Sequence, residues 1–157
     1  MQSLKVGIIG ASGFTGVELA RLLARHPHVA LQFLTSDRWV GESVSARLGI
    51  TSALKFVAND AATAKCDAIF LATPAETSLK LAPRLLEAGA RVIDLSGAFR
   101  LKDAALYPKF YGFPHDAPAT LAEAVYGLPE LFRSEELARA RLIANPGCYA
   151  TAVALAL

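Results

Sequence analysis

Residues 5–20 read KVGIIGASGFTGVELA, and this stretch decides the fold. The apolar run at 6–9 is typical of a strand buried in a parallel sheet. Glycines follow at 10, 13 and 16, and the pattern of apolar and charged residues from 17 to 25 indicates a helix. The spacing is G-x-x-G-x-x-G rather than the commoner G-x-G-x-x-G. A strand, a glycine-rich turn and a helix in this order predict a dinucleotide site, and the alternative is a tight turn that binds no ligand.

Each glycine of this turn has its own expected role. Gly10 allows a sharp turn, Gly13 a close approach of the backbone to a ligand, and Gly16 close packing of the helix on the strand. The helix N-terminus offers free N–H groups and the positive end of its dipole to an anion, most simply a pyrophosphate. We therefore expect the cofactor to contact the residues of the turn, which are Gly10, Ala11, Ser12, Gly13, Phe14, Thr15 and Gly16.

The composition limits the class of protein. The chain has 157 residues, of which 54% are hydrophobic and 19% charged, which predicts a compact globular domain. A net charge of +2 argues against nucleic acid or a membrane surface as partner. The two cysteines and three histidines show no ligand spacing, so we expect no metal, free thiols and a cytoplasmic location. Cys66 is expected to pack in the core.

Further strands are expected at 29–35, 68–72, 91–96 and 142–144, with a weaker candidate at 54–57, and helices at 77–88 and 135–141. Residues 39–53 read as a loop with at most one helical turn, and the proline- and aromatic-rich segment 103–124 as irregular. The alternation of strands and helices predicts an α/β fold. We expect a Rossmann-type, doubly wound, mainly parallel sheet with helices on both faces.

The end of the second strand is where such folds contact the adenine ribose. Ser36 and Arg38 favour NADP, because a guanidinium binds a phosphate with paired hydrogen bonds. Asp37 leaves NAD as the alternative cofactor, since an acidic residue at this position binds the ribose 2′-hydroxyl of NAD. A solvated turn with incidental charges is the alternative.

Two later strand ends also carry candidates, because ligands bind at the carboxyl edge of such sheets. Thr73 and Pro74 are expected to line the nicotinamide side of the cleft, or else to form a plain turn before the next helix. Ser96 and Arg100 fall where a substrate would lie, and an arginine there suits an anionic group. A surface salt bridge is the alternative role for Arg100.

The last strand is followed by Asn145-Pro146-Gly147, and Cys148 opens an apolar helix. The helix dipole favours the thiolate, which is the nucleophilic form. A thiolate beside a nicotinamide suggests attack on an acyl phosphate, loss of phosphate, and reduction of the thioester to an aldehyde. A buried structural cysteine is the alternative. No histidine is well placed for the proton transfers, and His115 is only a weak candidate.

Four segments, 10–16, 94–101, 125–131 and 145–151, together resemble N-acetyl-gamma-glutamyl-phosphate reductase, a relative of aspartate-semialdehyde dehydrogenase. The likeness covers essentially the whole chain. It implies an NADP-binding Rossmann domain, thioester chemistry at Cys148, and Arg100, Asn145 and Ser96 in substrate binding. The family often has an aspartate at the position of Ala98, which leaves the role of that position open.

The resemblance also implies a second, α+β domain that carries the catalytic histidine and the contacts of a homo-oligomer, a dimer or tetramer. Residues 149–157 form a helical pattern with no stop signal, so we expect the chain to be truncated at the start of that domain. The expected division is an NADP-binding domain at 1–144 and a catalytic-cysteine loop and helix at 145–157.

The expected activity is NADPH-dependent reduction of N-acetyl-gamma-glutamyl phosphate, a small-molecule substrate, to the semialdehyde in arginine biosynthesis. One alternative is a reductase of a carrier-protein-linked aminoadipyl or glutamyl phosphate, and another is an NADP-binding fragment without activity. A short-chain reductase or epimerase shares a similar glycine motif. That class needs a Tyr-x-x-x-Lys pair, and none of the four tyrosines has a lysine four residues on.

Overall fold

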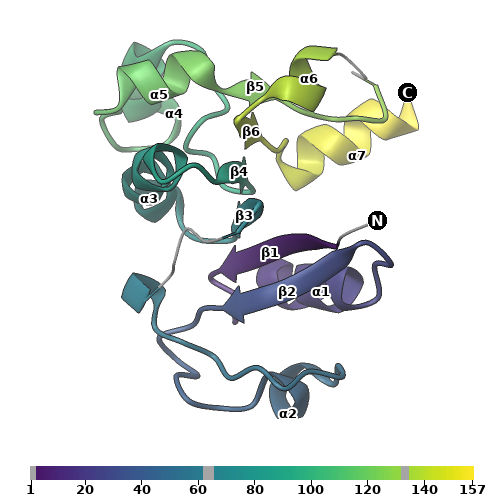
Figure 1. The fold of residues 1–157 in the computed structure, drawn as a ribbon. Coiled ribbons are helices and arrows are strands. Elements are labelled where there is room, and N and C mark those ends of the chain that lie inside the picture. The colour runs from purple at the N-terminus through teal and green to yellow at the C-terminus, as the bar shows by residue number, and fades with distance from the viewer. Residues whose placement is uncertain (1–2, 62–65, 132–134) are drawn as a thin grey trace. The chain divides into compact units, whose positions relative to one another are not determined.

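The computed structural model describes residues 3–61, 66–131 and 135–157. The chain divides into two compact units, Met1–Thr73 and Pro74–Leu157. Each unit contains three parallel strands and the helices that follow them (Figure 1). The division falls directly after the end of the third strand, so each unit is described here by itself.

In the first unit, β1 lies between β2 and β3 and pairs in parallel with both. The pairing with β2 runs from Leu4↔Val29 to Ile8↔Leu34, with a register shift between Val6 and Gly7. In Figure 1 helix α1 lies behind β1 and β2. The elements are, in chain order, β1 (Leu4–Ile9), α1 (Phe14–Ala24), β2 (Val29–Leu34), α2 (Val44–Leu48), the 3-10 helix η1 (Asn59–Ala61) and β3 (Ala68–Leu71).

The core of this unit joins the sheet to α1 and α2. Its buried members are Ile8, Ala11, Ala20, Leu34, Val44, Leu48 and Phe56, and Trp39 packs against them from the side. Burial of each large apolar side chain contributes about 1.5–3 kcal/mol. Gly7 interrupts the apolar strand for a steric reason, because a Cβ there would stand 2.3 Å from the Phe33 ring. The apolar positions of the sequence pattern thus lie inside, as expected for a strand of a parallel sheet.

In the second unit, β6 lies between β4 and β5 and pairs in parallel with both. The register runs from Val92↔Leu142 to Asp94↔Ala144 on one side of β6. The elements are α3 (Ala75–Glu87), β4 (Arg91–Asp94), the 3-10 helix η2 (Ala104–Leu106), α4 (Tyr107–Phe110), α5 (Pro118–Glu123), β5 (Val125–Tyr126), α6 (Glu135–Arg139), β6 (Leu142–Ala144) and α7 (Cys148–Ala156).

An aromatic cluster forms in the segment that follows β4 along the chain. Tyr107 is fully buried and packs against Tyr111, Phe113 and His115. Its hydroxyl lies 3.1 Å from the Leu101 nitrogen and 3.3 Å from the Leu101 oxygen, which satisfies the buried phenol. Burial is the main reason why the pKa of Tyr107 is raised. The cluster joins the first residue of α4 to the residues that follow this helix.

Three sequence expectations about this framework are corrected by the structure. Residues 54–57 form only isolated bridges, Thr35↔Val57 and Ser43↔Lys55, and β5 (Val125–Tyr126) is a strand that the sequence did not predict. The segment 103–124 contains two helices, α4 and α5, each with a proline in its first turn. Proline is preorganised for that position, so residues that read as helix breakers begin helices here. Within the described residues, no helix is both long and apolar enough to cross a membrane.

Candidate functional site

The turn between β1 and α1 depends on the absence of side chains at Gly10 and Gly16. Gly10 has a φ of +87°, and a Cβ there would stand 2.4 Å from the Ala72 oxygen. A Cβ on Gly16 would stand 2.5 Å from the Gly10 oxygen and 2.7 Å from the Ala11 Cα. Real Cβ atoms do not approach backbone so closely, so these two glycines allow the sharp turn and the close helix contact that were predicted for them.

Gly13 has a different environment. It is the N-cap of α1 in an extended conformation, with no side-chain cap, and a Cβ there would meet only the Gly10 oxygen at 3.7 Å. Phe14, the first helical residue, is 97% exposed. The first N–H groups of a helix have no partner within the helix, and here no side chain caps them. The end of α1 is therefore open to an anion, and its residues fit a dinucleotide pyrophosphate.

The turn after β2 presents Asp37 and Arg38 at its tip. Ser36 is buried, and its Oγ accepts a hydrogen bond from the Trp39 nitrogen at 3.2 Å. The Ser36 nitrogen donates to the Val57 oxygen at 2.9 Å. Ser36 thus fixes the turn, while Asp37 and Arg38 are exposed. Of the two residues predicted for the adenosine phosphate, the exposed guanidinium is the more accessible.

The Asp37 carboxylate is held by Asn59, a residue that the sequence analysis missed. The Asn59 nitrogen donates to Asp37 Oδ1 at 2.9 Å and Asn59 Nδ2 donates to Asp37 Oδ2 at 2.7 Å. A lone asparagine outside any motif carries no sequence signal, and only the fold brings it to the end of β2. Both carboxylate oxygens of Asp37, the residue that would suit NAD, therefore accept hydrogen bonds from within the protein.

Thr73 follows β3 and lies beside Gly10 of the glycine turn. A Cβ on Gly10 would stand 3.0 Å from Thr73 Cγ2. Pro74 begins the second unit and is the N-cap of α3, where its oxygen accepts hydrogen bonds from the nitrogens of Thr77 and Ser78, each at 3.0 Å. The predicted role of Thr73 and Pro74 on the nicotinamide side stays a prediction.

In the second unit, Asp94 ends β4 with a fully buried carboxylate. Asp94 Oδ1 accepts from the Ser96 nitrogen at 3.0 Å and Oδ2 from Ser96 Oγ at 2.9 Å. Burial raises the pKa of Asp94, and the hydrogen bonds from Ser96 and Ser78 and the charge of Arg100 act against that rise. The Ser96 hydroxyl, predicted to bind substrate, therefore donates to a carboxylate of its own chain.

Arg100 joins the ends of β4 and β6. Its Nε donates to the Asn145 oxygen and its Nη2 to the Leu95 oxygen, each at 2.8 Å. A Cβ on Gly147 would stand 3.1 Å from Arg100 Nη1, so the guanidinium lies against the residue that precedes Cys148. Arg100 is thus no surface salt-bridge arginine, and it shares one site with Asn145 and the cysteine turn.

Cys148 is the first residue of α7 and is exposed. The N-cap of α7 is Gly147, which provides no side-chain cap. The alternative of a buried structural cysteine is therefore wrong for Cys148. Cys66, by contrast, is buried, as expected for a cysteine that packs in the core. Burial raises the pKa of its thiol, and the charge of Asp67 raises it further. The Cys148 thiol is therefore accessible at a helix end that no side chain caps.

The family model described as semialdehyde dehydrogenase, NAD binding domain, matches residues 5–140. The chain belongs to this family. A curated N-acetyl-gamma-glutamyl-phosphate reductase of Nitrosospira multiformis is 48% identical over 97% of the chain, and that of Laribacter hongkongensis is 50% identical over 97%. The chain spans about 45% of the length of these relatives.

Among solved structures, aspartate semialdehyde dehydrogenase II of Vibrio cholerae in complex with ASA matches 99% of the chain and 45% of its own. The TM-score is 0.73 and the sequence identity 25%. The predicted Rossmann-type fold and the resemblance to the reductase family are both confirmed. The predicted boundary at residue 144 stays a prediction.

His115 has a structural place in this semialdehyde dehydrogenase domain. It is buried, its Nε2 lies 2.9 Å from the Ala98 oxygen, and its ring packs against Phe99 and Tyr107. Burial lowers the pKa of His115, which favours the neutral ring. Nδ1 has no hydrogen-bond partner in the described part of the chain. This histidine belongs to the aromatic cluster, which argues against a role in proton transfer.

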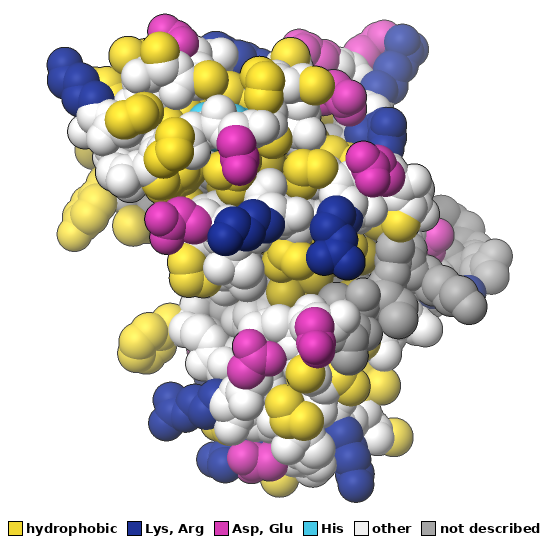
Figure 2. All heavy atoms as spheres, turned by 90° about the vertical axis from the view of Figure 1, so that its left-hand side faces the viewer, with side chains coloured by type: hydrophobic (Ala, Val, Ile, Leu, Met, Phe, Trp, Pro, Cys, Tyr) yellow, Lys and Arg dark blue, Asp and Glu magenta, His cyan; other side chains and the backbone are white. Residues whose placement is uncertain are grey.

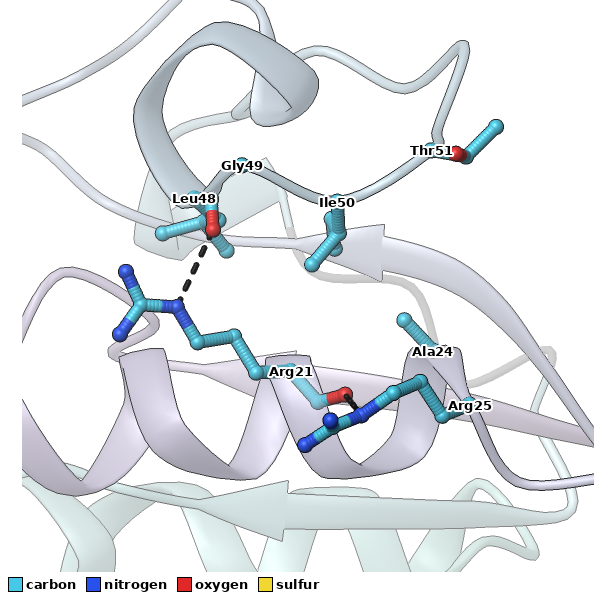
Figure 3. A pocket seen from close by; sticks show the side chains of 7 residues that line it. All are labelled: Arg21, Ala24, Arg25, Leu48, Gly49, Ile50 and Thr51. Atoms are coloured by element: carbon cyan, nitrogen blue, oxygen red, sulfur yellow. Dashed lines mark hydrogen bonds between the residues drawn. The ribbon is translucent and has the colours of Figure 1, made fainter.

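The domain also has cavities away from the glycine turn. One, of about 370 Å³, lies between the C-terminal half of α1 and residues 48–51, where Arg21 Nε donates to the Leu48 oxygen at 3.1 Å (Figure 3). Arg21 links α1 to α2 through this bond to Leu48, and it also pairs with Glu18 of its own helix at 2.7 Å. On the face drawn in Figure 2, side chains of both charges are interspersed. In residues 3–61, 66–131 and 135–157, no group of three His, Cys, Asp or Glu is placed to hold a metal ion.

Proposed function

We propose that this chain forms the cofactor-binding and thiol-bearing part of an NADPH-dependent N-acetyl-gamma-glutamyl-phosphate reductase, which makes N-acetylglutamate semialdehyde and phosphate. One observation carries the proposal: an exposed cysteine begins an uncapped helix beside an arginine, in a chain that also has the open glycine turn. The relatives that share about half of its residues bear the name of that enzyme.

In the proposed reaction the Cys148 thiolate attacks the acyl carbon, the bond from that carbon to the phosphate oxygen breaks, and phosphate leaves with the electron pair. NADPH, when bound, would supply the hydride that reduces the thioester to the aldehyde. Collapse of the reduced adduct returns the sulfur to the thiolate form. The end of α7 favours the thiolate before attack, through the helix dipole and the N–H groups of its first turn.

Arg100 is proposed to bind the anionic part of the substrate with Nη1. Its Nε and Nη2 are used by the Asn145 and Leu95 oxygens, which fix the plane of the guanidinium. A guanidinium held at two points presents its third nitrogen in a defined direction, and a positive charge beside the thiol favours both a phosphate and a thiolate. Asn145 is proposed to set the cysteine turn through its backbone oxygen.

NADPH is preferred to NADH in this proposal because Arg38 is exposed at the end of β2 while Asp37 is engaged by Asn59. The substrate is taken to be a small molecule and the enzyme a cytoplasmic homo-oligomer. A net charge of +2 and the interspersed charges of Figure 2 give no support to a nucleic-acid or membrane partner.

Acylation of the chain tests the proposal without any turnover. We expect the purified chain, mixed with N-acetyl-gamma-glutamyl phosphate, to release phosphate and to gain one N-acetylglutamyl group on Cys148, as seen by peptide mass. Cys148→Ser should gain none, and Cys66→Ser is the matched control that should react like the parent chain. Acylation that persists in Cys148→Ser, or a parent chain that is never acylated, would refute the role of this thiol.

A further inference from the structure

A chain of hydrogen bonds connects the turn after β2 to the glycine turn in the first unit. Asp37 accepts from the Asn59 nitrogen and from Asn59 Nδ2. Asn59 Oδ1 accepts from the Thr35 hydroxyl, and Thr35 Oγ1 in turn accepts from the Gly10 nitrogen at 3.1 Å. Thr35 is fully buried, so the middle of this chain is shielded from water.

The direction of each bond follows from chemistry. An ionised carboxylate only accepts, so the amide nitrogen of Asn59 must face Asp37 and its oxygen must face Thr35. The Thr35 hydroxyl has one proton, which goes to Asn59, and its lone pair receives the Gly10 N–H. The Asn59 side chain satisfies both neighbours, because its amide carries a donor and an acceptor on one planar group.

We propose that Asn59 is a positioning residue that sets cofactor selectivity, by holding both oxygens of Asp37 and by supporting Gly10 through Thr35. The inference rests on the proposed function, since it assumes that a dinucleotide binds at the glycine turn. A ribose diol would have to compete with Asn59 for the same two oxygens, which disfavours NADH. A bond to a charged group is worth more than a neutral one, so the competition is costly.

The test compares dissociation constants of NADPH and NADH, measured by titrating the nicotinamide fluorescence with the purified chain. Asn59→Ala should lower the ratio of the NADH constant to the NADPH constant about tenfold, because Asp37 Oδ2 is then free for the ribose, while Oδ1 still accepts from the backbone nitrogen of residue 59. In a chain that already carries Asp37→Ala, the same substitution should change the ratio by less than about twofold. Asp60→Asn, an exposed neighbour in η1, is the matched control and should leave the ratio unchanged.

Two single variants test the role of Asn59 in cofactor selectivity even if the Asn59→Ala chain does not fold. Asp37→Ala should leave the NADH constant within about twofold, because Asp37 is engaged by Asn59 in the parent chain. Thr35→Val, which cuts the other end of the chain of bonds, should weaken both cofactors alike. A tenfold loss of NADH binding in Asp37→Ala, or an unchanged ratio in a folded Asn59→Ala, overturns the inference. A parent chain that binds neither dinucleotide refutes the proposed function instead.

Discussion

Helices α1 and α7 begin in the same way and are held in place by different means. Each follows a parallel strand and has a glycine N-cap, with φ and ψ of −76° and 162° at Gly13 and −69° and 153° at Gly147. Neither helix has a side-chain cap. The turn before α1 is fixed by backbone contacts at Gly10 and Gly16, whereas the turn before α7 is fixed by the side chain of Arg100.

The difference shows two ways to keep the positive end of a helix open to an anion. In the first turn the close contacts at Gly10 and Gly16 require that these residues have no side chain, so a Cβ added at either position is destabilising. In the second turn the contacts depend on the Arg100 guanidinium, so removing that side chain is destabilising. The proposed ligands match this division, because a pyrophosphate needs backbone N–H groups at close range and a reacting acyl phosphate needs a charge beside the thiol.

The largest expected effect is that of Gly16→Ala. Alanine inside a helix usually stabilises it relative to glycine by about 1 kcal/mol. Here the added Cβ would stand 2.5 Å from the Gly10 oxygen, and only backbone movement can relieve the clash. We therefore expect a net loss near the upper end of about 1–3 kcal/mol in the free energy of unfolding, and NADPH binding weaker by more than about tenfold.

Urea denaturation and NADPH titration measure these two effects, and Gly13→Ala is the matched control. A Cβ on Gly13 would meet only the Gly10 oxygen at 3.7 Å, so its unfolding free energy should change by less than about 1 kcal/mol. NADPH binding should still weaken in Gly13→Ala, because that open space is where the cofactor is proposed to lie. Equal stability of the two variants would show that the turn before α1 is not fixed by close contact at Gly16.

A smaller effect is expected for Arg100→Ala. The substitution leaves the Leu95 and Asn145 oxygens without their donors, which costs about 1–2 kcal/mol in the free energy of unfolding. It also removes the positive charge beside the cysteine turn, so alkylation of Cys148 by iodoacetamide near pH 7 should slow. Cys66 is the internal reference, because its burial and raised pKa already make it slow.

Arg100→Lys separates the two roles of the guanidinium. Lysine keeps the charge and loses the planar fork that reaches both oxygens. We expect it to retain most of the Cys148 reactivity and to lose stability nearly as Arg100→Ala does, by urea denaturation and peptide mass. If the lysine variant were as stable as the parent chain, the two bonds of the guanidinium would not be what holds the second turn.

The turn before α1 could be predicted from the sequence, whereas the turn before α7 could be predicted only in part. The difference is whether the contacts that fix the turn are local in sequence or long-range. Glycines at 10, 13 and 16 carry their meaning locally, since the conformation and the close contacts lie within a few residues. The thiol at 148 was also local, because a strand, a proline–glycine turn and an apolar helix surround it. Arg100 is separated by 45 residues from Asn145 in the turn before that thiol, and its bonds go to backbone oxygens, which every residue carries.

The residues that no sequence pattern indicated also act through contacts between separate segments of the chain. Asn59 and Asp94 act through side-chain bonds to Asp37, Ser96 and Ser78, which depend on where separate segments meet. The strand at Val125–Tyr126 is two residues long and exists because β6 pairs with it. The prolines at 108 and 118 were read as breakers because a proline looks alike whether it ends a helix or begins one.

The smallest expected effect concerns pH and again distinguishes the two turns. Residues 10–16 contain no titratable side chain, whereas the second turn is tied to Asp94, whose backbone oxygen accepts from the Asn145 nitrogen at 2.8 Å. Burial raises the pKa of Asp94 above its ordinary value of 3.8, so the folded chain holds this proton more tightly than the unfolded chain. The stability that the protonated carboxyl contributes is complete below pH 3.8 and is lost as the pH rises through the folded pKa.

Hydrogen exchange followed by NMR can detect this local difference. Corrected for the intrinsic pH dependence of exchange, the protection of the Asn145 amide should fall as the pH rises from about 4 to 7, and that of the Ala11 amide should stay constant. Asp94→Asn cannot ionise, so its Asn145 amide should lose the pH dependence, although the variant also loses one of the two carboxylate oxygens that accept from Ser96; the backbone oxygen that accepts from the Asn145 amide is kept. A pH dependence that survives in Asp94→Asn would assign the titration to another group, and one shared by Ala11 would mean that the two turns open together.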